Sequence, residues 1–186
     1  MCIRDRSSSV AILEGMGIGG TALKDPVLLC RPELWRELAA GVPAAADGYV
    51  LVYMLNDNPD MCAFARNLAE REGLSARIVT FNPLKRAPRG LEGVCLPKPE
   101  EWVALFRDAS YVVTDSFHGT CFSLLFERPM VVFDPPKFSV RLKDVLGDFA
   151  LADRRAADGR NPMDIADATI DWSAVRACKE LSLIHI

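Results

Sequence analysis

Three features that mark common functional classes are missing from this sequence. No apolar run reaches the roughly 20 residues that a transmembrane helix needs, so we predict no transmembrane segment. The net charge of −3 provides no excess of cations, which argues against a nucleic-acid partner. No apolar signal-peptide segment follows the first residues, and we therefore expect a cytoplasmic protein.

Metal-site and disulfide patterns are missing as well. The six cysteines, at positions 2, 30, 62, 95, 121 and 178, form no C-x-x-C pair and have no histidine beside them. A structural zinc site needs such spacing. Most of these cysteines lie in apolar runs, as buried free thiols do. We expect a reducing compartment, no disulfide framework and no metal. Histidine is also scarce, because the chain contains only His118 and His185.

The length and composition indicate one domain. The chain has 186 residues, half of them hydrophobic, which is enough for a sizeable core. The sequences MCIRDR at the start and LSLIHI at the end match no pattern beside them, and we interpret them as non-native. We therefore expect a non-native start and connecting segment over 1–24, a folded domain over 25–181, and a non-native tail over 182–186. On this interpretation the chain is a fragment.

One glycine motif near the start suggests nucleotide binding but lacks the required context. Gly15–Gly20 matches G-x-G-x-x-G. A dinucleotide fingerprint needs a helix to open at its end, whereas Pro26 follows here without a helical period. We predict a flexible connection instead.

Strand and helix patterns alternate along the rest of the chain. An extended segment is predicted over 25–29 because proline disfavours a helical residue before it. The predicted strands are 8–13, 49–55, 77–81, 94–96, 111–114, 130–133 and 149–151. The predicted helices are 32–40, 59–72, 97–108, a segment from Ser116 to before Pro129, 138–146, and a segment from Ile165 onward. This alternation predicts an α/β fold, a Rossmann-like parallel sheet with helices on both faces.

The central stretch is Tyr111–Phe126, which predicts a strand, a tight loop and a buried helix. A helix N-terminus offers unpaired N–H groups and partial positive charge, which suits an anion. We expect Ser116, Gly119 and Thr120 at this helix start to contact substrate. His118 is of a type with an unperturbed pKa of about 6.5, so it can exchange a proton, or it can satisfy a buried backbone group.

Charged residues around this stretch fit the same site. The loops NDNP, FNP, TDSFHG and FDPPK follow predicted strands, and parallel strands bring such loops to one edge. Arg141 begins a later helix and either binds an anion or forms a surface salt bridge. Lys137 adds a point charge or is simply an exposed lysine, and Asp115 is a base or a turn residue. The basic loop 85–93 is either a solvated connection or gathers anions.

These residues resemble the polysaccharide pyruvyl transferases. The resemblance runs from about Asp25 to Leu146, and its specific part is TDSFHGTCFSLLF, followed by SVRL. It implies two Rossmann-like halves, of which this chain is the second, resembling one lobe of a GT-B-like transferase, with the N-terminal half missing. It also implies transfer of pyruvate from phosphoenolpyruvate, without a cofactor, to a sugar of a cell-surface polysaccharide, with His118 as the catalytic residue and Arg141 holding the donor.

Three alternatives remain open at this point. A GT-B-like glycosyltransferase would bind a nucleotide sugar at the same helix start. A phospho-receiver domain would use Asp57, Asp115 and Lys137, although the required acidic pair is lacking. A non-catalytic α/β domain would pack on a partner through an exposed apolar face.

Overall fold

The parallel sheet was correctly predicted. The computed structural model describes residues 7–19, 24–137 and 139–184. All five strand pairs are parallel, in the order β3-β2-β1-β4-β5-β6. The strands are β1 (Tyr49–Tyr53), β2 (Ser75–Thr80), β3 (Glu92–Cys95), β4 (Tyr111–Thr114), β5 (Met130–Phe133) and β6 (Arg155–Ala156). The order reverses between β1 and β4, which is where ligands bind in open sheets of this kind.

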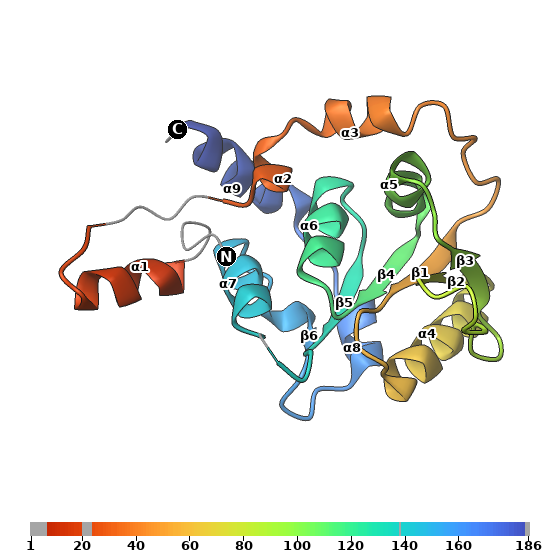
Figure 1. The fold of residues 1–186 in the computed structure, drawn as a ribbon. Coiled ribbons are helices and arrows are strands. Elements are labelled where there is room, and N and C mark those ends of the chain that lie inside the picture. Colours follow the sequence, from red (N-terminus) through yellow and green to blue (C-terminus); the bar gives the residue numbers. More distant parts are fainter. Residues whose placement is uncertain (1–6, 20–23, 138, 185–186) are drawn as a thin grey trace.

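Helices cover both faces of the sheet (Figure 1). One face carries α4 (Pro59–Glu72) and α8 (Pro162–Asp167), and the other carries α5 (Pro99–Asp108), α6 (Phe117–Leu125) and α7 (Val140–Asp148). The remaining helices are α1 (Ser7–Gly15), α2 (Pro26–Leu29), α3 (Pro32–Leu38) and α9 (Trp172–Ile184). Within the described ranges, no helix is both long and apolar enough to cross a membrane.

Alternating side chains of the strands build two separate cores. In β1, Leu51 packs with α5 and α6, whereas Val50 and Val52 pack with α4. The same alternation places Val112 on one face and Val113 on the other. Because both faces are covered, these strands are nearly continuously apolar, as expected for a buried parallel sheet.

The start and end of α4 follow local sequence signals. The Asn58 side chain accepts a hydrogen bond from the Met61 N–H at 3.1 Å, and Pro59 occupies the first helical position. Gly73 ends the helix with a φ of 67°. These residue types favour these positions at the ends of helices.

Three predicted extended segments are wrong. Residues 8–13 lie within the helix α1, which Figure 1 shows apart from the sheet, where no strand is available as a partner. The segment 25–29 contains α2, because the Asp25 carboxylate accepts from the Val27 N–H at 3.0 Å and starts a helix at Pro26. The segment 149–151 follows the last residue of α7, Asp148, and forms the turn that closes the helix. There the Leu151 N–H donates to the Leu146 carbonyl at 2.7 Å, around Ala150 with a φ of 56°. The sixth strand is Arg155–Ala156.

The glycine motif lies only partly within the described residues, because Gly20 is outside them. Gly17 makes a turn with a φ of 73° after α1. The next described helix, α2, begins only at Pro26, after its own cap at Asp25.

Candidate functional site

The loop and helix after β4 are fixed by short polar contacts. The Thr114 hydroxyl donates to the Tyr53 carbonyl at 2.6 Å and accepts from the Ser116 N–H at 3.0 Å. The Ser116 hydroxyl oxygen accepts from the Gly119 N–H at 3.3 Å, and the Thr120 hydroxyl donates to the Ser116 carbonyl at 3.1 Å. These contacts hold the N-terminus of α6 at the carboxyl ends of β1 and β4.

Gly119 allows α6 to sit directly on the sheet. A Cβ at this position would lie 2.3 Å from the Thr114 Oγ1 and 3.0 Å from the Tyr53 Cδ1, both closer than normal contact. The close neighbours of this glycine are thus the strands β4 and β1. Ser116, Gly119 and Thr120 are buried within these contacts, so substrate contact by the three remains a prediction.

Asp115 anchors the loop that follows β1. Its carboxylate accepts hydrogen bonds from the Leu55 N–H at 2.7 Å, the Asn56 N–H at 3.0 Å and the Asn56 side-chain amide at 2.8 Å. The residue is 4% exposed. Of the two roles that the sequence suggests for Asp115, these contacts favour ordering a turn over acting as a base.

We expect Asp115→Asn to destabilise the protein by about 2 kcal/mol, because an amide NH₂ would face N–H donors in a buried place. Chemical denaturation of the variant and the parent measures this difference. Asp47→Asn provides a control at an exposed position. Equal stabilities of Asp115→Asn and the parent would contradict the anchoring role.

A cavity of about 540 Å³ opens beside the start of α6. It contains the side chains of Phe117, Lys137 and Arg141, together with Asp115 and the loop residue Asn56. The Arg141 guanidinium carbon lies 3.8 Å from the centre of the Phe117 ring, a cation–π contact. Its Nη2 atom lies 3.6 Å from the Asp25 Oδ2, an ion pair longer than a hydrogen bond. We call this the Arg141 cavity.

His118 lies on the other side of Phe117. Its exposed ring is 5.4 Å from the Phe117 ring, centre to centre, and it lines a neighbouring groove of about 430 Å³. The sequence predicts one shared anion site for His118 and Arg141, and the structure instead places the two residues in adjacent hollows. The reason is helical geometry. Phe117, which contacts Arg141, and His118 are consecutive residues of α6, and consecutive helical residues point about 100° apart.

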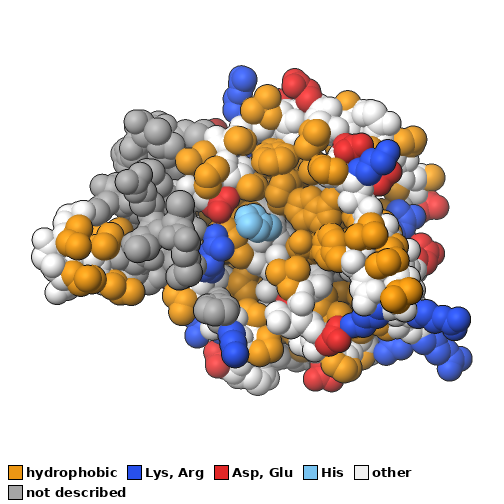
Figure 2. Space-filling view, viewed as in Figure 1, with side chains coloured by type: hydrophobic (Ala, Val, Ile, Leu, Met, Phe, Trp, Pro, Cys, Tyr) orange, Lys and Arg blue, Asp and Glu red, His pale blue; other side chains and the backbone are white. Residues whose placement is uncertain are grey.

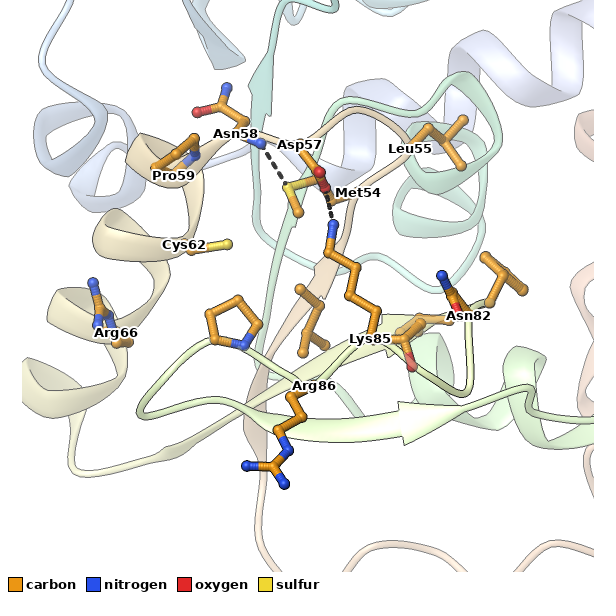
Figure 3. A pocket seen from close by; sticks show the side chains of 15 residues that line it. Met54, Leu55, Asp57, Asn58, Pro59, Cys62, Arg66, Asn82, Lys85 and Arg86 are labelled. Atoms are coloured by element: carbon orange, nitrogen blue, oxygen red, sulfur yellow. Dashed lines mark hydrogen bonds and ion pairs between the residues drawn. The ribbon is translucent and has the colours of Figure 1, made fainter.

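Another cavity at this edge, of about 600 Å³, lies between α4 and the loop after β2 (Figure 3). Its walls are largely apolar, from residues such as Met54, Ile78 and Val79. Lys85 in the basic loop 85–93 forms an ion pair with Asp57, and Arg66 donates to the Arg89 carbonyl at 3.0 Å. Of the two interpretations of this loop, a solvated connection or a loop that gathers anions, this pairing favours the connection.

Two of the charged residues that a phospho-receiver domain would use have other partners in this structure. Asp57 is exposed and forms an ion pair with Lys85, and the Asp115 carboxylate accepts its three hydrogen bonds from the loop after β1.

Across residues 7–19, 24–137 and 139–184, no group of three or more His, Cys, Asp or Glu side chains is placed to hold a metal ion.

Comparison with known proteins identifies the family. A sequence model of the polysaccharide pyruvyl transferases matches residues 1–136, so the chain belongs to the polysaccharide pyruvyl transferase family. The match includes His118 and ends before Lys137 and Arg141. A comparison with curated proteins finds no match.

Solved structures share the fold. UDP-GlcNAc 2-epimerase from Neisseria meningitidis, solved with UDP-GlcNAc bound, is 11% identical, with a TM-score of 0.56 over 97% of this chain and 53% of that one. A glycotransferase of kitacinnamycin is 16% identical, with a TM-score of 0.51 over 77% of this chain and 41% of that one. These likenesses confirm the predicted Rossmann-like, GT-B-like α/β fold. The chain spans about half or less of the length of these structures.

Two features of the site were not predicted from the sequence. Phe117 separates the two hollows, whereas the sequence predicts only a buried helix within the stretch Tyr111–Phe126. Asp25 pairs with Arg141 across a long stretch of chain, whereas the sequence predicts only an extended segment at 25–29.

Proposed function

We propose that this domain binds phosphoenolpyruvate in the Arg141 cavity and serves the transfer of its pyruvyl group to a sugar. The observation that carries the proposal is Arg141 itself, which stacks on Phe117 and lines a cavity at the N-terminus of α6. Phosphoenolpyruvate carries a phosphate and a carboxylate. A guanidinium fork and the partial positive charge of a helix start both favour such groups.

The charges around the cavity support an anionic ligand of this size. Lys137 lies exposed at its edge and adds a second cation. The two nearby carboxylates already have donors, since Asp115 accepts from the loop after β1 and Asp25 accepts from the start of α2. Membership of the family supports a pyruvyl transfer reaction over transfer of a sugar from a nucleotide.

The reaction that we propose joins two sugar hydroxyls to the central carbon of the donor. The enol methylene gains a proton and becomes a methyl group, and one hydroxyl oxygen adds to the central carbon. The bond from that carbon to the phosphate oxygen breaks, and the second hydroxyl closes the ketal. The two hydroxyls release two protons. One of them accounts for the proton that the methylene gains, and the other leaves with inorganic phosphate.

The two hollows suggest a division of roles. Arg141 and the helix start hold the negative charge of the departing phosphate. In this proposal His118, which lines the neighbouring groove, accepts a proton from an attacking hydroxyl. We further propose that residues 25–181 act as the donor-binding half of a two-lobed enzyme, with the other lobe completing the acceptor site. The partial coverage of the solved structures supports this proposal.

Binding of phosphoenolpyruvate to this chain tests the donor site directly. We expect calorimetric titration to show binding, and Arg141→Met to raise the Kd by about tenfold or more, because a charge-assisted contact is lost. Lys143→Met removes an exposed cation from the same helix and should leave the Kd unchanged. The same Kd in Arg141→Met and the parent would reject the assignment, as would tighter binding of a nucleotide sugar than of phosphoenolpyruvate.

A further inference from the structure

The groove that His118 lines is built mainly from ring side chains. It lies between α3, α5 and α6 and includes Trp35, Tyr53, Phe81, Trp102 and Phe122. Figure 2 shows hydrophobic side chains gathered next to the histidine on this face. The volume of about 430 Å³ falls within the range of small-molecule sites.

The rings hold one another in place. Trp102 lies 4.7 Å from Phe122 and 5.3 Å from Tyr53, centre to centre, and both pairs meet edge to face. Trp35 meets Phe122 in the same way at 4.9 Å. Phe81, 52% exposed, packs against Tyr53 at the mouth of the groove. Such contacts prepare the groove for a ligand, because few side chains must be ordered on binding.

The chemistry of the walls selects among ligands. None of the described residues that line the groove is Lys or Arg, so a phosphate group has no cation to meet there. The polar groups include the exposed His118 imidazole and the Tyr53 phenol, whose pKa is raised by burial. Trp35 and Trp102 add indole N–H donors, and neither of these buried groups has a hydrogen-bond partner among the described residues. A pyranose matches this combination, because its C–H face is apolar and packs on aromatic rings, while its edge carries hydroxyls.

We propose that this groove holds a pyranose ring of the acceptor, with the hydroxyl edge at His118 and the apolar face on the rings of Phe81 and Trp102. That this sugar is the acceptor rests on the proposed function. The groove adjoins the Arg141 cavity across Phe117, so a sugar bound there lies next to the donor site. This assigns part of the acceptor site to the present domain.

Binding of simple sugars to this chain tests the groove without turnover. The probes are the methyl pyranosides of glucose, galactose, mannose and N-acetylmannosamine, observed by saturation-transfer NMR. We expect at least one to bind and Phe81→Ala to raise its Kd by about tenfold, the scale of a lost ring contact. Leu84→Ala is the matched control, since Leu84 is 91% exposed on the same loop and does not line the groove.

A second pair of variants tests the effect of filling the groove with a larger side chain. Leu38 and Leu34 lie on α3 with similar exposure, 45% and 48%, and only Leu38 lines the groove. Leu38→Arg should abolish sugar binding, and Leu34→Arg should preserve it.

Several results would overturn the inference. The first is the absence of saturation transfer to all four sugars. The second is equal sugar binding by the parent and by the variants Phe81→Ala and Leu38→Arg. The third is binding of uridine monophosphate in the groove in preference to the sugars. Self-association that Leu38→Arg removes would assign the groove to a second copy instead. Titration with phosphoenolpyruvate separates the two proposals. If the chain binds a sugar and not phosphoenolpyruvate, the proposed function is rejected and a sugar site remains. If it binds phosphoenolpyruvate and no sugar, this inference is rejected.

Discussion

Replacing His118 with alanine is expected to lower the rate of phosphate release from phosphoenolpyruvate by at least roughly a hundredfold, the scale of a lost general acid–base group. The assay uses the domain joined to the N-terminal lobe of the proposed enzyme, with a sugar acceptor present. Because His118 lines the groove and not the Arg141 cavity, the loss should appear in kcat, while the Kd for phosphoenolpyruvate stays close to that of the parent.

The matching variant on the donor side should behave differently. Arg141→Ala should also lower the rate by roughly a hundredfold or more, because it removes charge that stabilises the departing phosphate. Here donor binding should weaken together with kcat. Lys143→Ala, an exposed position on the same helix, serves as the control. If both variants keep the rate of the parent, neither residue takes part in the reaction and the assignment of the site is rejected.

Gly119→Ala should destabilise the fold by about 3 kcal/mol, since overpacking a rigid contact has costs of this order. A Cβ would lie 2.3 Å from the Thr114 Oγ1, whose position is fixed by hydrogen bonds to the Tyr53 carbonyl and the Ser116 N–H. The helix cannot move away without breaking its own cap at Ser116. In thermal denaturation we expect a midpoint lower by roughly 6–12 °C for a chain of this length.

A second glycine provides the control for this effect. Gly147 lies inside α7, and a Cβ there would meet nothing within 4 Å. Gly147→Ala should therefore raise stability by about 0.5–1 kcal/mol, because alanine is the better helix former. A similar change in the two variants would mean that helix propensity, and not contact with the sheet, decides the result.

Much of the fold was predictable because its signals are local. The strands Tyr111–Thr114 and Met130–Phe133 are short apolar runs with the predicted bounds, and α4 carries Asn58 and Gly73 at its two ends. The end of α7 was not predictable in this way. Its left-handed residue is Ala150, which carries none of the glycine signal that usually marks such a helix end.

The candidate site was predictable in position and not in detail. The pattern of alternating strands brings the loops after β1, β4 and β5 to one edge, which is where the structure has them. That Phe117 would separate His118 from Arg141 depends on how α6 is turned against its neighbours. The pairing of Arg141 with Asp25 likewise depends on tertiary packing that spacing along the chain does not encode.

The Asp25–Arg141 pair has a thermodynamic consequence for the proposed donor site. An anion that takes the guanidinium competes with Asp25, so the two equilibria are linked and each weakens the other by the same factor. Asp25 also caps α2, and α2 packs on α9. Anion binding in the proposed donor site is thereby coupled to two helices, neither of which contributes a lining residue to the cavity.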